Sequence, residues 1–140
     1  MLRILGFTGT RRGLMTRQTA ELQALLLRLR QRGATEFHHG DCVGADAAAH
    51  DIAKGLGYRV VIHPPLNDAA RAYKHGDDVR APAPYLERNR MIVRACDALI
   101  AAPAQREEQR RSGTWATVRF ARTQARLLYM LWPSYPEGRT

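Results

Sequence analysis

The alternation of apolar strand-like runs with helical patterns is the feature that most constrains how this chain folds. Between the short apolar runs, apolar positions recur at the helical period, as in Leu22, Leu26 and Leu29. Strands separated by helices predict a parallel sheet with right-handed crossovers and helices on both faces. We therefore expect one Rossmann-like α/β domain over residues 1–140, with about five mainly parallel strands. The expected strands are residues 2–7, 35–38, 58–62, 98–102 and 127–132, and the expected helices are residues 16–33, 45–56, 85–96 and 113–124.

Two local features complete this expectation. Thr16 precedes the first apolar helical position and is expected to cap the first helix. Residues 67–84 break the alternation, because Gly, Pro and Asp accumulate there and the periodic pattern weakens. We expect a long loop with at most one helical turn, and a loop of that length in a compact domain is more often functional than idle.

The segments that follow strands differ chemically from those that follow helices. The post-helix segments are plain, such as Arg32-Gly33-Ala34, whereas every post-strand segment is rich in Gly, Asp, Arg, His or Pro. In parallel α/β sheets, ligands bind at the carboxyl ends of the strands, near the point where strand order reverses. We therefore expect one binding site at one edge of the sheet. Its expected residues are Gly9, Thr10, Arg11, Gly40, Asp41, Asp46, Arg88, Asn89, Ser112, Gly113 and Thr114.

The turn Ser112-Gly113-Thr114 opens the last long helix and is the expected phosphate site. The first turn of a helix presents unpaired backbone N–H groups at the positive end of the dipole. Glycine lets the backbone approach an anion closely, and the two hydroxyls add donors. An ordinary helix cap is the alternative interpretation, since Ser and Thr are favoured there in any case.

The charge of the chain agrees with an anionic ligand. The formal net charge is +9, and of the 22 basic residues only Lys54 and Lys74 are not arginine. Arginine suits phosphate through its planar bidentate fork. The same bias can reflect genome composition. No dense basic tract with interleaved aromatic residues marks a nucleic-acid surface, so nucleic acid is a possible but less favoured partner.

Other classes of protein are not supported by the sequence. No apolar run approaches the roughly 20 residues of a membrane span, and the N-terminus lacks a signal-peptide layout, so we expect a cytoplasmic protein with no membrane partner. Cys42 and Cys96 are the two cysteines, which supports neither a disulfide framework nor a zinc ribbon. His38 and His39 are potential metal ligands, but strand alternation sends them to opposite faces. We expect no metal site and no cofactor.

The order of the motifs resembles the SLOG superfamily, which includes lonely-guy phosphoribohydrolases, DNA-processing SMF proteins and nucleotide-signal sensor domains. The resemblance covers nearly the whole chain. It rests on residues 6–11, 40–46, 88–91 and 112–114. It implies a Rossmann-like nucleotide-binding fold and association into a homo-oligomer, for which the apolar bands of residues 16–33 and 85–96 offer support.

The resemblance to phosphoribohydrolases stops at the catalytic carboxylate. Members of that family carry Pro-Gly-Gly-x-Gly-Thr-x-x-Glu, whose Gly-Thr matches Gly113-Thr114. They also carry an upstream Arg-Lys-x-x-Met motif that supplies an arginine, and Arg88 and Met91 lie at a similar place. The glutamate position is Thr117 here, which cannot ionise. Cleavage of an N-glycosidic bond needs a carboxylate near the ribose. Asp41 and Asp46, with Arg88, are the remaining catalytic candidates.

We therefore expect binding, as a sensor or by sequestration, of a nucleotide or nucleotide-derived signalling ligand. A phosphoribohydrolase that cleaves nucleoside 5′-monophosphates is the first alternative, and a single-strand DNA-binding module is the second. Whether the protein is an enzyme stays open at this point.

Several residues keep two interpretations from the sequence alone. Arg11 and Arg12 follow a glycine turn and either reach a phosphate or lie in solvent. Asp41 either accepts ribose hydroxyls or caps the next helix. Asp46 and His50 share one helical face and form either a polar pair or a ligand contact. Trp115 either stacks on a base or belongs to the core.

Overall fold

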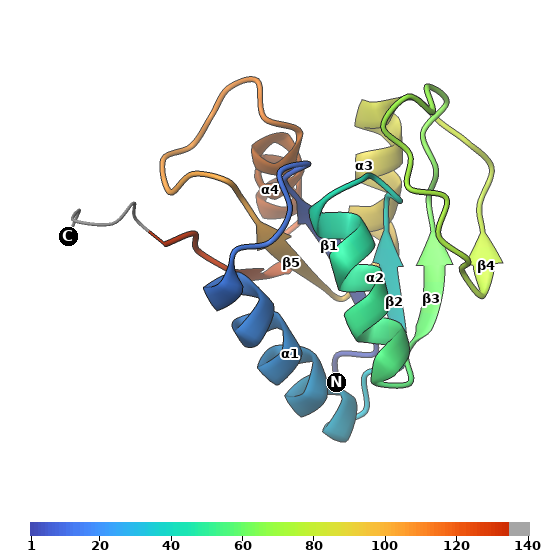
Figure 1. Cartoon of the computed structure of the whole chain (residues 1–140), viewed down its shortest axis with the longest axis vertical. Coiled ribbons are helices and arrows are strands. Elements are labelled where there is room, and N and C mark those ends of the chain that lie inside the picture. The colour runs from blue at the N-terminus through green and yellow to red at the C-terminus, as the bar shows by residue number, and fades with distance from the viewer. Residues whose placement is uncertain (135–140) are drawn as a thin grey trace.

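The computed structural model describes residues 1–134 and has a six-stranded sheet between two layers of helices (Figure 1). Every strand pairing is parallel, which confirms the α/β class and the parallel sheet. The strands are β1 (Ile4–Gly9), β2 (Glu36–His39), β3 (Arg59–Ile62), β4 (Asp78–Val79), β5 (Ala98–Ala102) and β6 (Leu127–Met130). The helices are α1 (Thr16–Gln31), α2 (Ala45–Gly55), α3 (Tyr85–Ala95) and α4 (Gly113–Thr123).

The sheet has one more strand than the sequence predicts. β4 lies within residues 67–84, where we expected only loop, and pairs with Val61 and Ile62 of β3. Two residues are too short to show a strand period, so tertiary contacts create the pairing. The Asp77 carboxylate supplies one such contact by accepting the Val60 N–H at 2.7 Å. No helix forms between residues 67 and 84.

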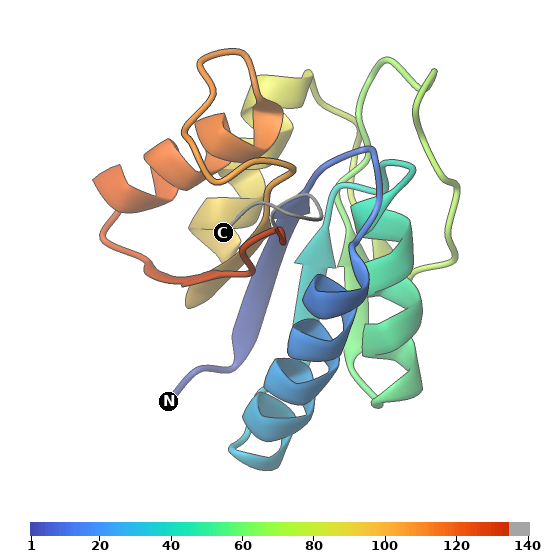
Figure 2. The same ribbon diagram turned by 60° about the vertical axis from the view of Figure 1, so that its left-hand side comes forward.

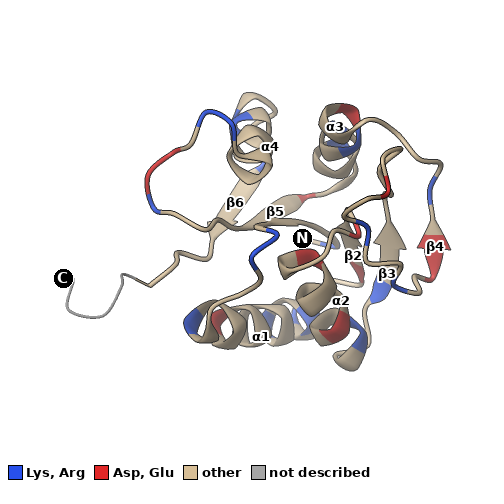
Figure 3. Ribbon diagram, turned by 45° about the horizontal axis from the view of Figure 1, so that its top comes forward, with Lys and Arg blue, Asp and Glu red and all other residues tan. Residues whose placement is uncertain are grey.

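The helices cover both faces of the sheet, as expected. Figure 3 shows α1 and α2 on one side and α3 and α4 on the other. Leu5 and Phe7 of β1 point into the larger apolar core with α1 and α2. Gly6 points the other way, where a Cβ would lie 3.0 Å from both Cys96 Sγ and the Ile92 side chain. The absence of a side chain at Gly6 therefore lets α3 pack directly on the centre of the sheet.

The strand order β4-β3-β2-β1-β5-β6 fixes where a ligand site can form. The chain runs outward from β1 through β2 and β3, then crosses to the other side of β1 to form β5 and β6. Strand order therefore reverses between β1 and β5, and neighbouring loops diverge there. The loops that follow the strands gather at the carboxyl end of the sheet (Figure 2). Among residues 1–134, no helix has both the length and the apolar character that crossing a bilayer requires.

Gln18, not Thr16, organises the start of α1. The N-cap is Met15, whose N–H donates to Gln18 Oε1 at 3.0 Å. The same side chain donates from Nε2 to the carbonyl oxygens of Pro103 at 3.0 Å and Leu131 at 2.9 Å. The buried amide therefore ties α1 to the chain just after β5 and β6. The prediction that Thr16 caps α1 was wrong. The helix begins one residue earlier than that prediction implies, because Gln18 bonds to the Met15 N–H and to two distant carbonyls.

We expect Gln18→Leu to lower the free energy of unfolding by about 2 kcal/mol or more, since it leaves two buried carbonyls without a donor. Gln23→Leu is the control on the exposed face of α1, and surface changes usually stay within about 0.5 kcal/mol. Urea denaturation followed by circular dichroism measures both. Equal unfolding midpoints for the two variants would contradict the bridging role of Gln18.

Candidate functional site

A cleft with a volume of about 460 Å³ lies at the carboxyl ends of β1 and β5. Segments far apart in the sequence form its walls, and each of them follows a strand or begins a helix. Its lining includes residues 7–12, Gly40, Cys42, Asp46, Tyr85, Arg88, Asn89, Ile92, Ala104 and residues 111–114. Of the residues expected from sequence to form the site, Asp41 alone does not line this cleft. The part that the others play in binding stays a prediction.

The first turn of α4 opens into the cleft. The N–H groups of Gly113 and Thr114 belong to this turn and have no partner within the helix. Ser112 is the N-cap, and its Oγ accepts the Trp115 N–H at 3.2 Å. Gly113 is exposed, and a Cβ built there meets no atom within 4 Å. The turn is therefore an ordinary helix cap, and the space beside the Cα of Gly113 is open.

Arg88 places a buried positive charge in the wall of the cleft. The residue is 5% exposed, and its Nη1 donates to the carbonyl oxygens of Gly40 at 2.6 Å and His63 at 3.2 Å. Its Nε donates to Asn89 Oδ1 at 2.7 Å. A Cβ on Gly40 would collide with the guanidinium group. Gly40 is thus needed for the placement of Arg88, and the partners of Arg88 are neutral.

Asp46 is the sole carboxylate among the described residues that line the cleft. The side chain is 5% exposed, and its Oδ2 accepts the Cys42 N–H at 3.2 Å. Oδ1 has no hydrogen-bond partner. Burial raises the pKa of Asp46 to about 6, although the nearby charge of Arg88 acts in the opposite direction. Asp46 does not pair with His50, whose Nδ1 lies 2.9 Å from His39 Nε2 instead.

Asp41 serves the long loop instead of the cleft. Its oxygens accept from Arg71 Nε at 2.9 Å and from the Lys74 N–H at 3.0 Å. Its own carbonyl accepts the Ala72 N–H at 2.7 Å, and its φ of 57° lies in the left-handed region. The carboxylate therefore anchors the segment after β3. Neither expectation for this side chain, a ribose contact or a helix cap, describes these bonds.

Tyr85 is a cleft residue that the sequence did not reveal. The guanidinium carbons of Arg11 and Arg88 lie 5.3 Å and 5.4 Å from the centroid of its ring. The Tyr85 hydroxyl donates to the carbonyl oxygen of Asn67 at 3.0 Å. In the sequence Tyr85 looks like an ordinary first residue of a helix. The preceding Pro84 marks a helix start but does not indicate a contact with two arginines.

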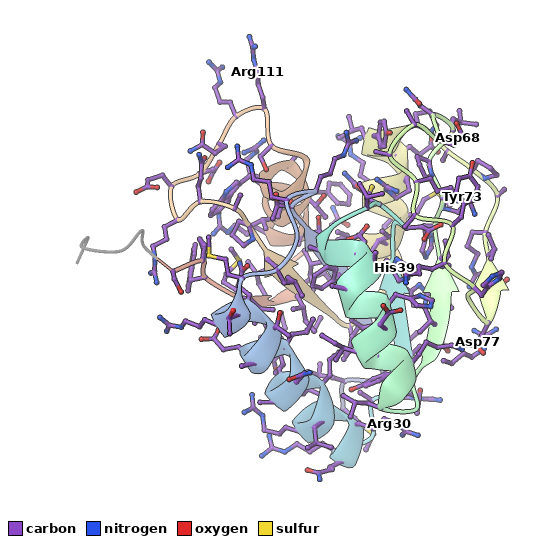
Figure 4. The ribbon with its side chains drawn as sticks, viewed as in Figure 1. Arg30, His39, Asp68, Tyr73, Asp77 and Arg111 are labelled. Atoms are coloured by element: carbon purple, nitrogen blue, oxygen red, sulfur yellow. The ribbon has the colours of Figure 1, made fainter. Side chains whose placement is uncertain are left out.

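Two further arginines stand at the cleft. Arg12 lines it next to Arg11, and Arg111 precedes the α4 cap. Figure 4 shows the Arg111 side chain projecting outward from the loop before α4, so it forms part of the rim. From the sequence, Arg12 and Arg11 together were expected either to reach a phosphate or to lie in solvent, and Arg111 was not among the expected site residues.

Two tight contacts hold the walls of the cleft together. Gly44, at φ 89°, lies so close to Arg11 that a Cβ would strike the Arg11 backbone. The next residue, Ala45, donates its N–H to the carbonyl oxygen of Thr10 at 3.0 Å. The loop after β1 is therefore bonded directly to the start of α2.

Thr117 and Trp115 do not line the cleft. Thr117 is buried, and its hydroxyl donates to the carbonyl oxygen of Gly113 at 2.8 Å. Thr117 occupies the position that holds glutamate in the phosphoribohydrolase motif. Its side chain is thus buried and hydrogen-bonded to the first turn of its own helix. Trp115 packs against Trp132 with ring centroids 6.0 Å apart, in a cluster with Ala101 and Val118. Trp115 is therefore a core residue.

Two pairs of buried histidines lie next to the cleft. His38 Nδ1 is 2.9 Å from His63 Nε2, and His39 Nε2 is 2.9 Å from His50 Nδ1. Figure 4 labels His39, which lies between α2 and the sheet. His39 thus contacts α2, whereas the partners of His38 are His63 and Glu36. Within residues 1–134, no group of three or more His, Cys, Asp or Glu residues is arranged to hold a metal ion.

The overall fold is shared with proteins of known structure. One is DNA processing protein A of Helicobacter pylori, which has a single-stranded DNA binding mode. It aligns with a TM-score of 0.68 and 18% sequence identity, and the alignment covers 96% of this chain and 67% of that protein. The molybdenum cofactor binding protein of Rippkaea orientalis aligns with a TM-score of 0.70 at 17% identity over 93% and 76%. DNA processing protein A of Streptococcus pneumoniae aligns with a TM-score of 0.68 at 18% identity, over 97% of this chain and 52% of its own.

These likenesses show the fold, since the identities lie below 20%. The chain spans about half the length of the pneumococcal protein. No family model matches the sequence, and no curated protein matches it significantly.

We expect the free energy of unfolding to fall as the pH drops below about 6.5. Burial lowers the pKa of His38, His39, His50 and His63, that of His63 to about 3, so the folded protein binds fewer protons than the unfolded chain. Each such histidine costs up to about 1.4 kcal/mol per pH unit below its unfolded pKa. Asp46 acts oppositely between about pH 6 and 3.8, because its folded pKa is raised. The four histidines outweigh this single carboxyl group, so the net effect of lower pH is a loss of stability.

Urea denaturation at pH 7.5 and 5.5 tests this dependence. His63→Gln should reduce the loss between the two pH values, whereas His75→Gln, at an exposed position, should leave the loss unchanged. A parent protein equally stable at both pH values would contradict the expectation.

Proposed function

We propose that this is a cytoplasmic protein of the SLOG superfamily that binds a nucleotide or a nucleotide-derived small molecule in the cleft. The phosphate would lie at the first turn of α4, against Gly113 and Thr114. The observation that carries the proposal is that the first turn of α4, with Gly113 and Thr114, lines the cleft at the point where strand order reverses. Helix N-termini at such points are favourable anion sites, because N–H groups and the dipole act together.

The charges around the cleft support an anionic ligand. Four arginines line it, against the single carboxylate of Asp46. Arg88 has the greatest weight among them, because it is buried and hydrogen-bonds to neutral partners. A buried cation without a carboxylate partner is costly, and a ligand phosphate would compensate that cost.

Binding explains this site better than hydrolysis does. A phosphate cradle holds the ground state and the transition state about equally, so it provides affinity without rate. Glycoside cleavage usually uses two carboxyl groups, whereas one carboxylate lines this cleft within the described residues. The phosphoribohydrolase alternative is favoured by one observation, the pKa of about 6 for Asp46, which suits a general acid or base.

Single-stranded DNA is the second alternative ligand. The rim arginines Arg12 and Arg111 would contact a phosphate backbone, and the fold is similar to that of a single-stranded DNA-binding protein. DNA affinity that falls steeply with salt, together with weak mononucleotide binding, would favour this alternative.

We also propose that copies of the chain associate. Leu27 of α1 and Leu86 of α3 are about half exposed on helices that flank the sheet. Sedimentation should give a species larger than a monomer. A monomer at all accessible concentrations would remove this part of the proposal.

We expect Gly113→Val to weaken the binding of nucleoside 5′-monophosphates at least tenfold, because its side chain would occupy the place of the anion. The matched control is Gly55→Val, because a Cβ at Gly55 also meets no atom within 4 Å and Gly55 lies at the far end of α2. Both variants should stay folded. Isothermal titration calorimetry measures the affinities, and equal affinity for Gly113→Val and parent would show that the phosphate lies elsewhere.

We expect the parent protein to release little or no free base from a panel of nucleoside monophosphates, since no second carboxyl group lies at the cleft within the described residues. Chromatography of the reaction products measures the release. Asp46→Asn, which keeps the size of the side chain, is the matched variant. Robust turnover by the parent that is lost in Asp46→Asn would establish the phosphoribohydrolase alternative.

A further inference from the structure

Two of the arginines that line the cleft share one aromatic ring. Arg11 lies in the loop after β1 and Arg88 lies in α3, and their guanidinium carbons are 5.3 Å and 5.4 Å from the centroid of the Tyr85 ring. A guanidinium group within about 6 Å of a ring centroid is attracted by the ring quadrupole. Tyr85 therefore gathers two positive charges, from two different elements, at one wall of the cleft.

The guanidinium group of Arg88 has one nitrogen whose donors are poorly used. Its Nη1 and Nε donate to carbonyl and amide oxygens, whereas its Nη2 donates to Cys42 Sγ at 3.6 Å. A thiol sulfur is a weak acceptor, and a phosphoryl oxygen is a much stronger one for a guanidinium group. Cys42 itself lines the cleft, so Nη2 is directed at a residue of the cleft wall.

The Cys42 thiol lies in the field of both arginines. Burial raises its pKa and so does the charge of Asp46, whereas the charges of Arg88 and Arg11 lower it. Arg11 and Arg88 thus approach the same residue of the cleft wall as well as the same ring. An anion bound between them would be close to two guanidinium groups at once.

These two like charges are brought together by parts of the chain that are fixed independently. The Ala45 N–H holds the loop of Arg11 through the carbonyl oxygen of Thr10 at 3.0 Å, and two backbone carbonyls hold Arg88. Two cations at short range repel each other, and an anion between them replaces that repulsion with two attractions. The pair of arginines is therefore suited to an anionic group.

Asp46 does not cancel the charge of this pair. It is the one carboxylate among the described residues that line the cleft, and burial raises its pKa to about 6. An anion bound nearby raises the pKa of a carboxyl group further. Asp46 can thus take up a proton when an anionic ligand binds, and both positive charges then remain for the ligand.

The first turn of α4 lines the same cleft and offers a separate position for an anion. We propose that the ligand is a nucleoside 5′-diphosphate or longer 5′-polyphosphate, with one phosphate at the first turn of α4 and the next between Arg11 and Arg88. The proposal rests on the proposed function, because it takes the first phosphate to lie at Gly113. Tyr85 is a positioning residue in this arrangement, because it acts through the two guanidinium groups. The cleft volume of about 460 Å³ is within the usual range of small-molecule sites.

Calorimetry without divalent cations, using the 5′-monophosphate and the 5′-diphosphate of one nucleoside, tests the proposal. The parent should bind the diphosphate about tenfold more tightly or better, as expected for one added charge-assisted contact. Arg11→Gln should remove most of this preference, because it takes one charge from the pair. Arg111→Gln makes the same change at the rim of the cleft and should leave the preference unchanged. An equal loss in both variants would mean that total charge sets the preference, and would overturn the pair.

Tyr85→Phe and Tyr85→Leu form a matched pair that tests the shared ring. Phenylalanine keeps the ring and loses the hydroxyl bond to Asn67, so the preference for the diphosphate should persist. Leucine lacks the ring, so the preference should fall, and thermal melting followed by circular dichroism shows whether the variant is folded. A preference that persists in folded Tyr85→Leu would overturn the positioning role. If Tyr85→Leu does not fold, the comparison of Arg11→Gln with Arg111→Gln decides.

The outcomes separate this inference from the proposed function. Equal affinities of the parent for the two nucleotides, with monophosphate binding still weakened in Gly113→Val, would overturn the second phosphate position and leave the proposed function intact. Absence of binding of either nucleotide would overturn both. Inorganic pyrophosphate that binds as tightly as the nucleoside diphosphate would overturn the nucleoside as part of the ligand.

Discussion

The buried guanidinium group of Arg88 is the interaction on which the arrangement of the cleft depends. It connects α3 to the ends of β2 and β3, because it donates to the carbonyl oxygens of Gly40 and His63. The glycine after β2 provides the space that it fills. Neutral carbonyls hold the charge in place but do not neutralise it, and taking a charge out of water is costly unless it is paired. The same bonds that stabilise the packing of α3 therefore keep a positive potential at the carboxyl end of the sheet.

Asp46 is the counterpart of this charge. It lies close enough for Arg88 to lower its pKa, yet the hydrogen-bond partners of the Arg88 side chain are Asn89, Cys42 and two backbone carbonyls, and burial keeps the pKa of Asp46 near 6. A direct ion pair would have neutralised the charge of Arg88. The observed separation instead leaves one group with unmatched positive charge and another with an unmatched acceptor, which suits a ligand that has both an anionic and a neutral polar part.

The sequence predicted most of the sheet and the edge that holds the cleft, because alternation and the contrast between post-strand and post-helix segments depend on local residue types. It failed where distant residues decide the outcome. β4 is two residues long and is created by its pairing with β3. Asp41 looked like a ligand or cap residue, but its partners are Arg71 and Lys74, about thirty positions along the chain. Tyr85 gave no signal, because its contact with Arg11 exists only once α3 packs beside the loop after β1. Trp115 could be assigned to the core only once Trp132 lay beside it.

The close approach of Gly44 to the Arg11 backbone has a consequence for the thermodynamics of recognition. A loop that carries two arginines would ordinarily sample many conformations, and a ligand would have to restrict them at an entropic cost. Here the backbone on which Arg11 stands is fixed against α2 by the Thr10–Ala45 hydrogen bond and by the missing side chain at Gly44. Only the side chains remain to be ordered. The cleft is in this sense preorganised, so more of each favourable contact with a ligand is retained as net affinity. A substitution at Gly44 would displace the Arg11 backbone and weaken recognition, although Gly44 itself does not line the cleft.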